Sequence, residues 1–341
     1  MSSPDNTEET DRPIPNMNPQ PVETTPAPTS SLLTSMPPPP QGSQDPLEEL
    51  IRPFPTPPPT TLPPAAGPLV VPRDFLGVYG LRENPFADCV HPGFYYRTAS
   101  HTSAFSNMML AVEFEAALGM LTGPSGTGKT LVSQLLLEHL NQPKYKTILV
   151  LVTPGMSKTG LLREILSEMN VALPVGMTPL HDLVKLLSNE IIDLHQRGQR
   201  LVLILDECHL LTSDCLHVVR TISNIEIPQR KLVTCLLFAE SRLAQRLQHA
   251  SYESLRNRIY LRATLAPLNQ VDVGQYIKYR LIVAGRMTDL FTPEAIWALH
   301  EKSGGICRSL NKLCLLSIVE GATRQQQIID KDTVLACADR M

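Results

Sequence analysis

Apolar positions follow two different patterns along this chain. Four continuous apolar runs lie at residues 116–121, 147–152, 201–205 and 231–238. Between them, apolar residues recur every three or four positions, at about 100–115, 131–140, 161–169 and 179–196. Runs rich in leucine and β-branched residues are typical of strands buried on both faces, whereas the longer spacing is typical of helices.

Strands that alternate with helices predict a parallel sheet with right-handed crossover connections. After Pro267 the pattern is helical to the end of the chain. We therefore predict an α/β fold with a folded core over residues 73–265 and a helical C-terminal part over residues 266–341.

The first 72 residues differ in composition from the rest. They hold most of the chain's 31 prolines and almost no aromatic residues. Such a segment buries too little apolar surface to offset the entropy of ordering it, so we predict disorder with polyproline II character. Two interpretations stay open: the tail presents Pro-x-x-Pro ligands to a partner, or it is a spacer.

Charge and cysteine content narrow the class of protein. The tail has eight acidic and two basic side chains, so the formal net charge of −3 leaves +3 for residues 73–341. A charge this small neither predicts nor excludes nucleic-acid binding. Seven scattered cysteines without a C-x-x-C pair suit reduced thiols in a cytoplasm.

The sequence contains neither a recognisable targeting signal nor the spacing of a zinc site. The sequence has no signal-peptide pattern and no apolar run long enough to span a membrane, so we expect no integral membrane segment and a cytoplasmic location. Cys208, His209, Cys215 and His217 lie close together, but their spacing does not match a zinc site, and ordinary helix packing is favoured.

A glycine-rich loop lies between the first apolar run and the helical segment that follows it. The loop fits G-x-x-x-x-G-K-[ST] and consists of Gly123, Pro124, Ser125, Gly126, Thr127, Gly128, Lys129 and Thr130. Glycines let backbone N–H groups turn toward an anion at a helix N-terminus. In this motif the lysine reaches the β- and γ-phosphates and the final hydroxyl binds Mg²⁺. The loop therefore predicts binding of a nucleoside triphosphate.

An acidic pair, Asp206 and Glu207, follows the apolar run 201–205 directly. Asp206 is the candidate magnesium ligand, and Glu207 is the candidate base that polarises the attacking water. Alone, the pair also fits the acidic start of a helix. Combined with the phosphate loop it predicts triphosphate hydrolysis, with the loop and the acidic pair at the tips of neighbouring strands.

Three arginines are candidates for contacting the γ-phosphate. Arg256 and Arg258 follow the strand and helix after residue 231, and a solvated helix end is their alternative interpretation. Arg308 lies in the first turn of a predicted helix after Gly304 and Gly305. A cation is unfavourable at a helix N-terminus, so Arg308 is predicted to meet an anion.

These motifs, taken together, resemble AAA+ ATPases of the general secretion pathway protein A (ExeA/GspA) type, which are related to the TnsC and TniB transposition ATPases. The resemblance covers about residues 75–337. It is carried by residues 79–86, 91–96, 121–130, 205–211, 265–268 and 304–311.

The resemblance implies a P-loop NTPase fold of the ASCE class, with a parallel sheet between helices and a C-terminal helical lid. It implies that ATP and Mg²⁺ are the cofactors and that Leu81 and Phe86 lie beside the adenine. It further implies that Arg258 or Arg256 acts as a finger across a subunit interface and that Arg308 senses the γ-phosphate. A ring or filament of identical subunits follows from the finger.

Three features depart from the family pattern. Glu240 takes the sensor-1 position, usually Gln or Asn, and an anion there weakens nucleotide binding unless it faces Mg²⁺ or a basic partner. Cys307 replaces a proline before the sensor arginine. Secretion members usually continue into a membrane helix and a peptidoglycan-binding domain, whereas this sequence ends at Met341, so nothing in it indicates an envelope role.

Three functions stay open. The first is an oligomeric ATPase that drives or switches assembly of a larger machine, such as one for secretion or pili, with protein partners. The second is a transposition-type ATPase whose partner is DNA, recognised by salt-sensitive stimulation. The third is a scaffold that binds ATP and hydrolyses it slowly because of Glu240.

Overall fold

The computed structural model describes residues 74–87, 92–173, 176 and 179–341. The Pro-rich tail lies outside these residues. The prediction of disorder and its two interpretations, as a partner ligand or as a spacer, therefore stay predictions.

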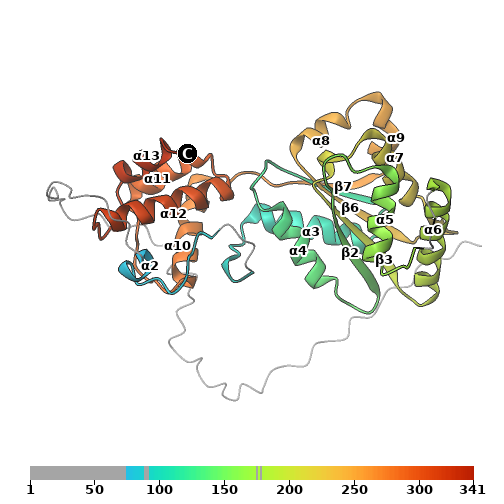
Figure 1. Cartoon of the computed structure of the whole chain (residues 1–341), viewed down its shortest axis with the longest axis horizontal. Helices are drawn as coiled ribbons and strands as arrows, with labels where there is room; N and C mark the ends of the chain where they lie inside the picture. Colours follow the sequence, from blue (N-terminus) through green and yellow to red (C-terminus); the bar gives the residue numbers. More distant parts are fainter. Residues whose placement is uncertain (1–73, 88–91, 174–175, 177–178) are drawn as a thin grey trace, which may run out of the picture. The chain divides into compact units, whose positions relative to one another are not determined.

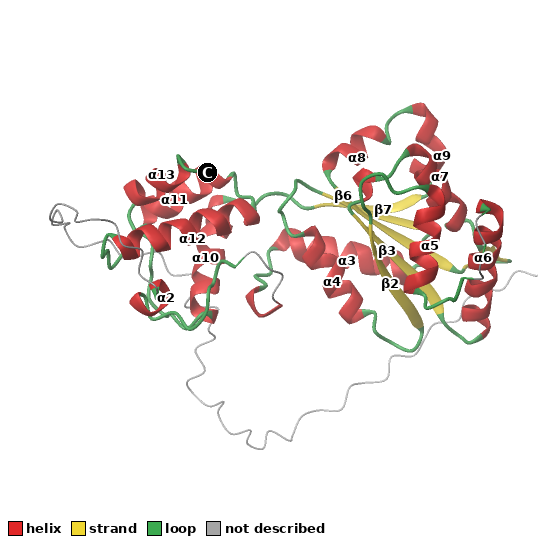
Figure 2. Ribbon diagram, viewed as in Figure 1, coloured by secondary structure: helices red, strands yellow, loops and turns green. Residues whose placement is uncertain are grey.

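Five parallel strands form the central sheet, in the order β2-β3-β6-β1-β7. Their bounds are β1 Leu118–Thr122, β2 Tyr145–Leu151, β3 Arg200–Asp206, β6 Val233–Ala239 and β7 Ile259–Thr264. β3 and β6 are buried along their whole length, as their continuous apolar runs predict. The predicted α/β fold with a parallel sheet is confirmed (Figure 2).

Two features of the sheet differ from expectation. β6 lies between β1 and β3, so the predicted placement of the phosphate loop and the acidic pair on neighbouring strands is wrong. β7 was not predicted as a strand. It is an edge strand whose residues alternate between buried Ile259 and Ala263 and exposed Tyr260, Arg262 and Thr264, and this pattern is weaker than a continuous apolar run. A short antiparallel pair, β4 Glu226–Ile227 and β5 Arg230–Lys231, was also not predicted.

Helices cover both faces of the sheet (Figure 1). One face packs against α3 Ala99–Glu113 and α4 Lys129–His139. The other packs against α5 Lys158–Glu168, α6 Leu180–Gln196, α7 Ser213–Ile222, α8 Ser241–Arg246 and α9 Glu253–Arg256. Along β3 the side chains alternate between the two cores, because successive residues of a strand point to opposite faces.

The C-terminal helices have a hydrophobic core of their own. They are α10 Gln270–Val283, α11 Pro293–Ser303, α12 Cys307–Thr323 and α13 Lys331–Ala338. The short helix α2 Phe75–Val78 and the segment after it contribute Tyr79, Leu81, Phe86 and Phe94 to this core. The lead-in segment of the chain is therefore anchored by apolar burial against helices about 200 residues later in sequence.

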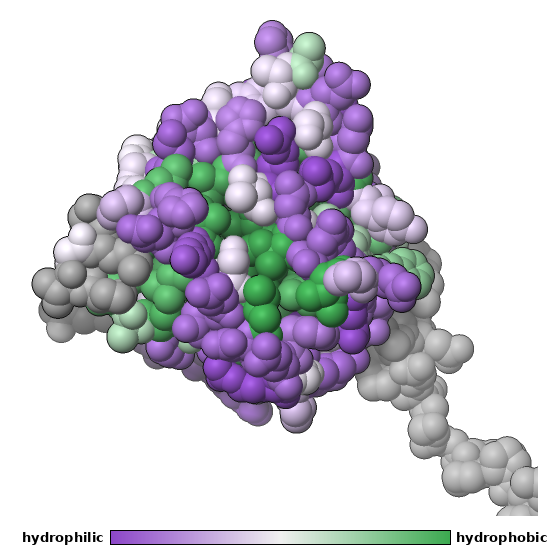
Figure 3. All heavy atoms as spheres, turned by 90° about the vertical axis from the view of Figure 1, so that its right-hand side faces the viewer, coloured by the Kyte–Doolittle hydropathy of each residue, from purple (hydrophilic) through white to green (hydrophobic). Residues whose placement is uncertain are grey.

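Within the described part of the chain, no helix combines the length and the apolar character needed to cross a membrane. Figure 3 shows one face of the sheet-bearing part, on which apolar residues form a central area ringed by polar ones. Surface areas of this kind are typical of sites where protein chains associate.

Gly304 and Gly305 join α11 to α12 and both have positive φ, 59° and 70°. A Cβ atom at Gly305 would lie 2.1 Å from the carbonyl oxygen of Leu268, whereas one at Gly304 would meet nothing within 4 Å. Position 305 requires glycine for both space and conformation, whereas position 304 requires it for conformation alone.

We expect Gly304→Ala to lower the free energy of unfolding by about 1–2 kcal/mol, the cost of a left-handed backbone for an L-residue. Gly305→Ala should cost at least about 2 kcal/mol more, because backbone must also move. Urea denaturation of both variants measures the difference. Equal losses would contradict the assigned contact with Leu268.

Candidate active site

The phosphate loop runs from the end of β1 to the start of α4. Gly126 and Gly128 have φ of 77° and 99°, a conformation that side-chain-bearing residues rarely adopt. Gly126 is constrained a second time, because a Cβ atom there would lie 2.8 Å from Cβ of Arg308. The glycines of the motif therefore serve both the turn of the loop and the close approach of α12.

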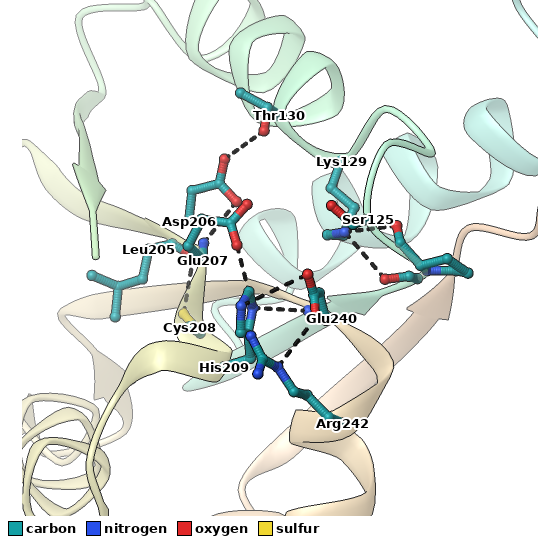
Figure 4. Close-up of polar contacts among 12 residues, drawn as sticks. Ser125, Lys129, Thr130, Leu205, Asp206, Glu207, Cys208, His209, Glu240 and Arg242 are labelled. Carbon is teal, nitrogen blue, oxygen red and sulfur yellow. Dashed lines mark hydrogen bonds and ion pairs between the residues drawn. The ribbon is translucent and has the colours of Figure 1, made fainter. Parts of the chain in front are cut away.

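Lys129 is the first residue of α4, and its buried side chain turns back over the loop. Nζ donates to the carbonyl oxygens of Gly123 and Pro124 at 3.1 and 2.9 Å (Figure 4). Burial lowers the pKa of this amine, and the nearby carboxylates, Glu207 foremost, oppose that effect. The ammonium group thus lies at the loop where the motif predicts it to meet phosphate oxygens.

Thr130 and Asp206 meet across the tip of the sheet. The hydroxyl of Thr130 donates to Oδ2 of the buried Asp206 at 2.9 Å, and the backbone N–H of Glu207 donates to Oδ1 at 2.8 Å. Hydroxyl and carboxylate oxygens are ligands that Mg²⁺ prefers. The two residues therefore fit a magnesium ion bound beside the loop, as the sequence predicts.

Glu207 follows β3 in a left-handed conformation, with φ of 60°. Such strain in a residue other than glycine is characteristic of functional sites. The side chain is one-third exposed, lines the same cavity as the loop, and places Oε2 3.3 Å from Nδ1 of His209. A carboxylate held at this edge of the cavity is positioned to polarise a water molecule.

His209 lies between the side chains of Glu207 and Glu240 (Figure 4). The backbone N–H of Glu240 donates to Nδ1 at 3.3 Å, which requires a neutral ring protonated on Nε2. Burial lowers the pKa of His209, in agreement with that state. Nε2 then faces Oε1 of Glu240 at 3.8 Å.

Glu240, the departure at the sensor-1 position, has a basic partner. Its Oε2 lies 3.1 Å from Nε of Arg242 at the start of α8. Arg242 is thus the basic partner that an acidic residue at the sensor-1 position is expected to need.

A cavity of about 310 Å³ extends from the loop. Its lining includes Ser125, Gly126, Gly128–Leu131 and Glu207 around the loop, and Arg308 from α12. It also includes Phe94, Tyr95, Tyr96, Tyr276, Arg280 and Asn311. Its size is in the range of small-molecule sites.

Leu81 and Phe86 do not line this cavity, since both are buried in the core of the C-terminal helices. Ala87, next to Phe86, does line it. A contact of Leu81 or Phe86 with adenine stays a prediction.

The candidate arginines lie in two places. Arg308 contacts the loop: its backbone N–H donates to the carbonyl of Gly126 at 3.1 Å, and Nη1 lies 3.5 Å from Oγ of Ser125. Arg256 donates to the carbonyls of Leu247 and Gln248 at 3.3 and 3.0 Å. Neither Arg256 nor Arg258 lines the cavity, and the finger role stays a prediction.

The cysteines near the site are directed to other contacts. The thiols of Cys208 and Cys215 donate to the carbonyls of Leu205 and Met156. Among the described residues, the cluster with metal-ligand spacing is Glu207, His209 and Glu240. Cys307 starts α12 where the family has proline, and burial raises the pKa of its thiol to about 11.

Sequence reasoning missed several cavity residues. His101 on α3 places Nε2 3.1 Å from the carbonyl of Thr127 and Nδ1 2.7 Å from the hydroxyl of Thr98. Tyr276 and Asn311 are joined by a hydrogen bond of 2.8 Å, and Arg280 lies beside Tyr276. In the sequence this region was marked only by the aromatic run at residues 94–96 and by the stretch 304–311 that ends at Asn311; His101, Tyr276 and Arg280 sit in ordinary helical patterns.

Comparisons with known proteins agree with this fold. A family model described as an AAA domain matches residues 112–247. General secretion pathway protein A of Aeromonas hydrophila is 32% identical over 263 residues, which is 76% of this chain and 47% of that protein. The chain thus spans about half the length of this relative.

Solved structures share the fold. The Aeropyrum pernix ORC2 protein, in ADPNP-ADP complexes, has a TM-score of 0.56 at 14% identity, covering 75% of this chain and 71% of its own. Cdc6p from Pyrobaculum aerophilum has a TM-score of 0.57 at 14% identity, with 72% and 67% covered. Drosophila ORC bound to DNA has a TM-score of 0.56 at 15% identity, with 85% and 72% covered.

The fold and the phosphate-loop site define an AAA+ P-loop NTPase. Within that class the chain is similar to general secretion pathway protein A over three quarters of its length.

Stability should fall as the pH is lowered through the range in which the unfolded chain protonates His101. Burial lowers the pKa of His101, so below the ordinary value of about 6.5 the unfolded state binds more protons than the folded state. His101→Gln should therefore reduce the loss of unfolding free energy between pH 7 and pH 5, measured by urea denaturation. His181→Gln, an exposed change on α6, is the control and should leave that loss unaltered. Equal pH dependence in all three proteins would contradict the prediction.

Proposed function

We propose that this protein binds Mg-ATP in the cavity and hydrolyses it. One observation carries the proposal: Lys129, Thr130, Glu207 and Arg308 line a single cavity at the phosphate loop, and Asp206 accepts a hydrogen bond from Thr130. These groups supply the positive charge, magnesium ligands and carboxylate that phosphoryl transfer to water requires.

The roles follow from position. The loop amides and Lys129 bind the β- and γ-phosphates, and Arg308 reaches the γ-phosphate from α12. Thr130 and Asp206 hold Mg²⁺, which when bound neutralises charge on the phosphate oxygens. Glu207 accepts a hydrogen bond from the attacking water, and the ring of His209 lies beside its carboxylate.

The ATPase is proposed to act as a homo-oligomeric ring or filament, in which Arg258 of one subunit reaches the nucleotide of the next. Nε of Arg258 is buried without a hydrogen-bond partner, whereas Arg256 is engaged with two carbonyls of its own subunit. Arg258 is therefore the better candidate, and Arg256 supports the loop after α8.

The Aeromonas hydrophila relative is a general secretion pathway protein. We therefore propose that the ATPase cycle drives or switches assembly of a larger protein machine. DNA is the alternative partner, since a solved structure of the same fold is that of ORC bound to DNA. Stimulation of hydrolysis by duplex DNA that weakens steeply with salt would favour that alternative.

Glu207→Gln should lower the rate of Mg-ATP hydrolysis at least about 100-fold and leave ATP affinity unchanged, because the amide cannot accept a proton from water. Phosphate release and calorimetric ATP binding measure the two quantities. Glu164→Gln, an exposed change on α5, is the matched control and should have the wild-type rate. If Glu207→Gln protein hydrolyses ATP at the wild-type rate, Glu207 is not the catalytic carboxylate. The ATP-binding scaffold with slow hydrolysis is then favoured.

Arg258→Ala should lower hydrolysis roughly 10³-fold, the usual contribution of an arginine finger. Mixing it with inactive Glu207→Gln protein should restore activity, since some interfaces then combine an intact Glu207 with an intact Arg258. Arg256→Ala gives no such recovery, because its loss acts within one subunit. A mixture that is only as active as its separate components would exclude a finger acting in trans.

A further inference from the structure

A second arginine, besides Arg308, lines the cavity. Arg280 on α10 is 6% exposed, and its guanidinium carbon lies 5.2 and 5.1 Å from the ring centroids of Phe94 and Tyr276. Nη1 donates to the hydroxyl of Tyr276 at 2.7 Å, and that hydroxyl donates to Asn311 at 2.8 Å. The guanidinium group thus lies close to two aromatic rings and is hydrogen-bonded to one of them.

Within the described part of the chain, the charge of Arg280 has aromatic neighbours but no anionic partner. Nε has no hydrogen-bond partner, and no carboxylate among the described residues forms an ion pair with this side chain. Arg200 is buried to a similar degree and its Nε also lacks a partner, but it donates to the carbonyl of Val112 and the hydroxyl of Thr234, and the carboxylate of Glu115 acts on it. A buried cation without such partners is costly and is kept where a ligand supplies the acceptors.

The surroundings of Arg280 indicate which part of a ligand it meets. The phosphate end of the cavity has its own cations, Lys129 and Arg308, and both contact the loop. Arg280 instead contacts Phe94 and Tyr276, and the ring of Tyr96 lies 6.4 Å from that of Tyr276. Aromatic faces suit a flat base, and a guanidinium suits ring nitrogens, carbonyl oxygens and hydroxyl oxygens.

We propose that Arg280 is a nucleoside-recognition residue, whose free N–H groups donate to acceptor atoms of the base or ribose. The proposal rests on the proposed function, because it requires that the cavity hold a nucleotide. The Tyr276–Asn311 pair fixes the orientation of the guanidinium before the ligand enters, so little conformational entropy is lost on binding.

This role predicts opposite effects on stability and binding. Arg280→Met keeps the apolar stem and removes the uncompensated charge, so the melting temperature of the ligand-free protein should stay the same or rise. The affinity for ATP and for ADP should fall roughly ten- to hundred-fold, as expected for loss of hydrogen bonds from a charged donor. The affinity for inorganic tripolyphosphate, which has no nucleoside, should not change.

Calorimetry of wild type, Arg280→Met and Arg280→Lys with the three ligands tests the proposal. Arg280→Lys retains the charge but not the fork of donors, so it should weaken ATP binding less than Arg280→Met. It also serves as the folded variant should the methionine protein fail to fold. Lys278→Met, on the same helix but outside the cavity, should bind all three ligands like wild type.

Two results would overturn the proposal. A lower melting temperature with unchanged ATP affinity would make Arg280 a structural residue of α10. An equal loss of tripolyphosphate affinity would make it a phosphate contact. Failure of the wild-type protein to bind ATP is a different result, because it rejects the proposed function itself.

Discussion

In the proposed site the tips of β1 and β3 act on one ligand, although β6 separates the two strands in the sheet. The hydrogen bond from Thr130 to Asp206 spans that gap, with the hydroxyl on the first turn of α4 and the carboxylate on the last residue of β3. Parallel strands make this possible, because their carboxyl ends lie at one edge. The cavity, the loop and Glu207 all depend on that shared edge.

The lid reaches the same edge through the start of α12. Arg308 donates its backbone N–H to Gly126, and only glycine leaves room for this approach. The linker glycines 304 and 305 set the direction in which α12 begins. A change in the loop on nucleotide binding would therefore be transmitted directly to the helical part, which also holds the lead-in segment in its core.

Charges within the site are balanced locally. The acidic residue that replaces the usual amide at the sensor-1 position is paired with Arg242 and lies beside His209, which in turn contacts Glu207. A neutral His209 faces Glu240 with its Nε2–H and adds no charge beside the two carboxylates. The departure from the family pattern thus comes with neighbours that accommodate it.

The sequence alone determined the sheet, most of its strands and the residues of the phosphate loop and acidic pair. These are local properties: apolar runs form buried strands, and glycines with positive φ and a helix start form an anion site. Strand order depends on contacts between distant segments of the chain. The place of β6 and the edge strand β7 therefore emerged only from the tertiary structure. The same holds for Arg280, His101 and Tyr276, which lie in ordinary helical patterns and become cavity residues because α3 and α10 bring them there. Their positions depend on how distant elements pack, and no short stretch of sequence encodes that.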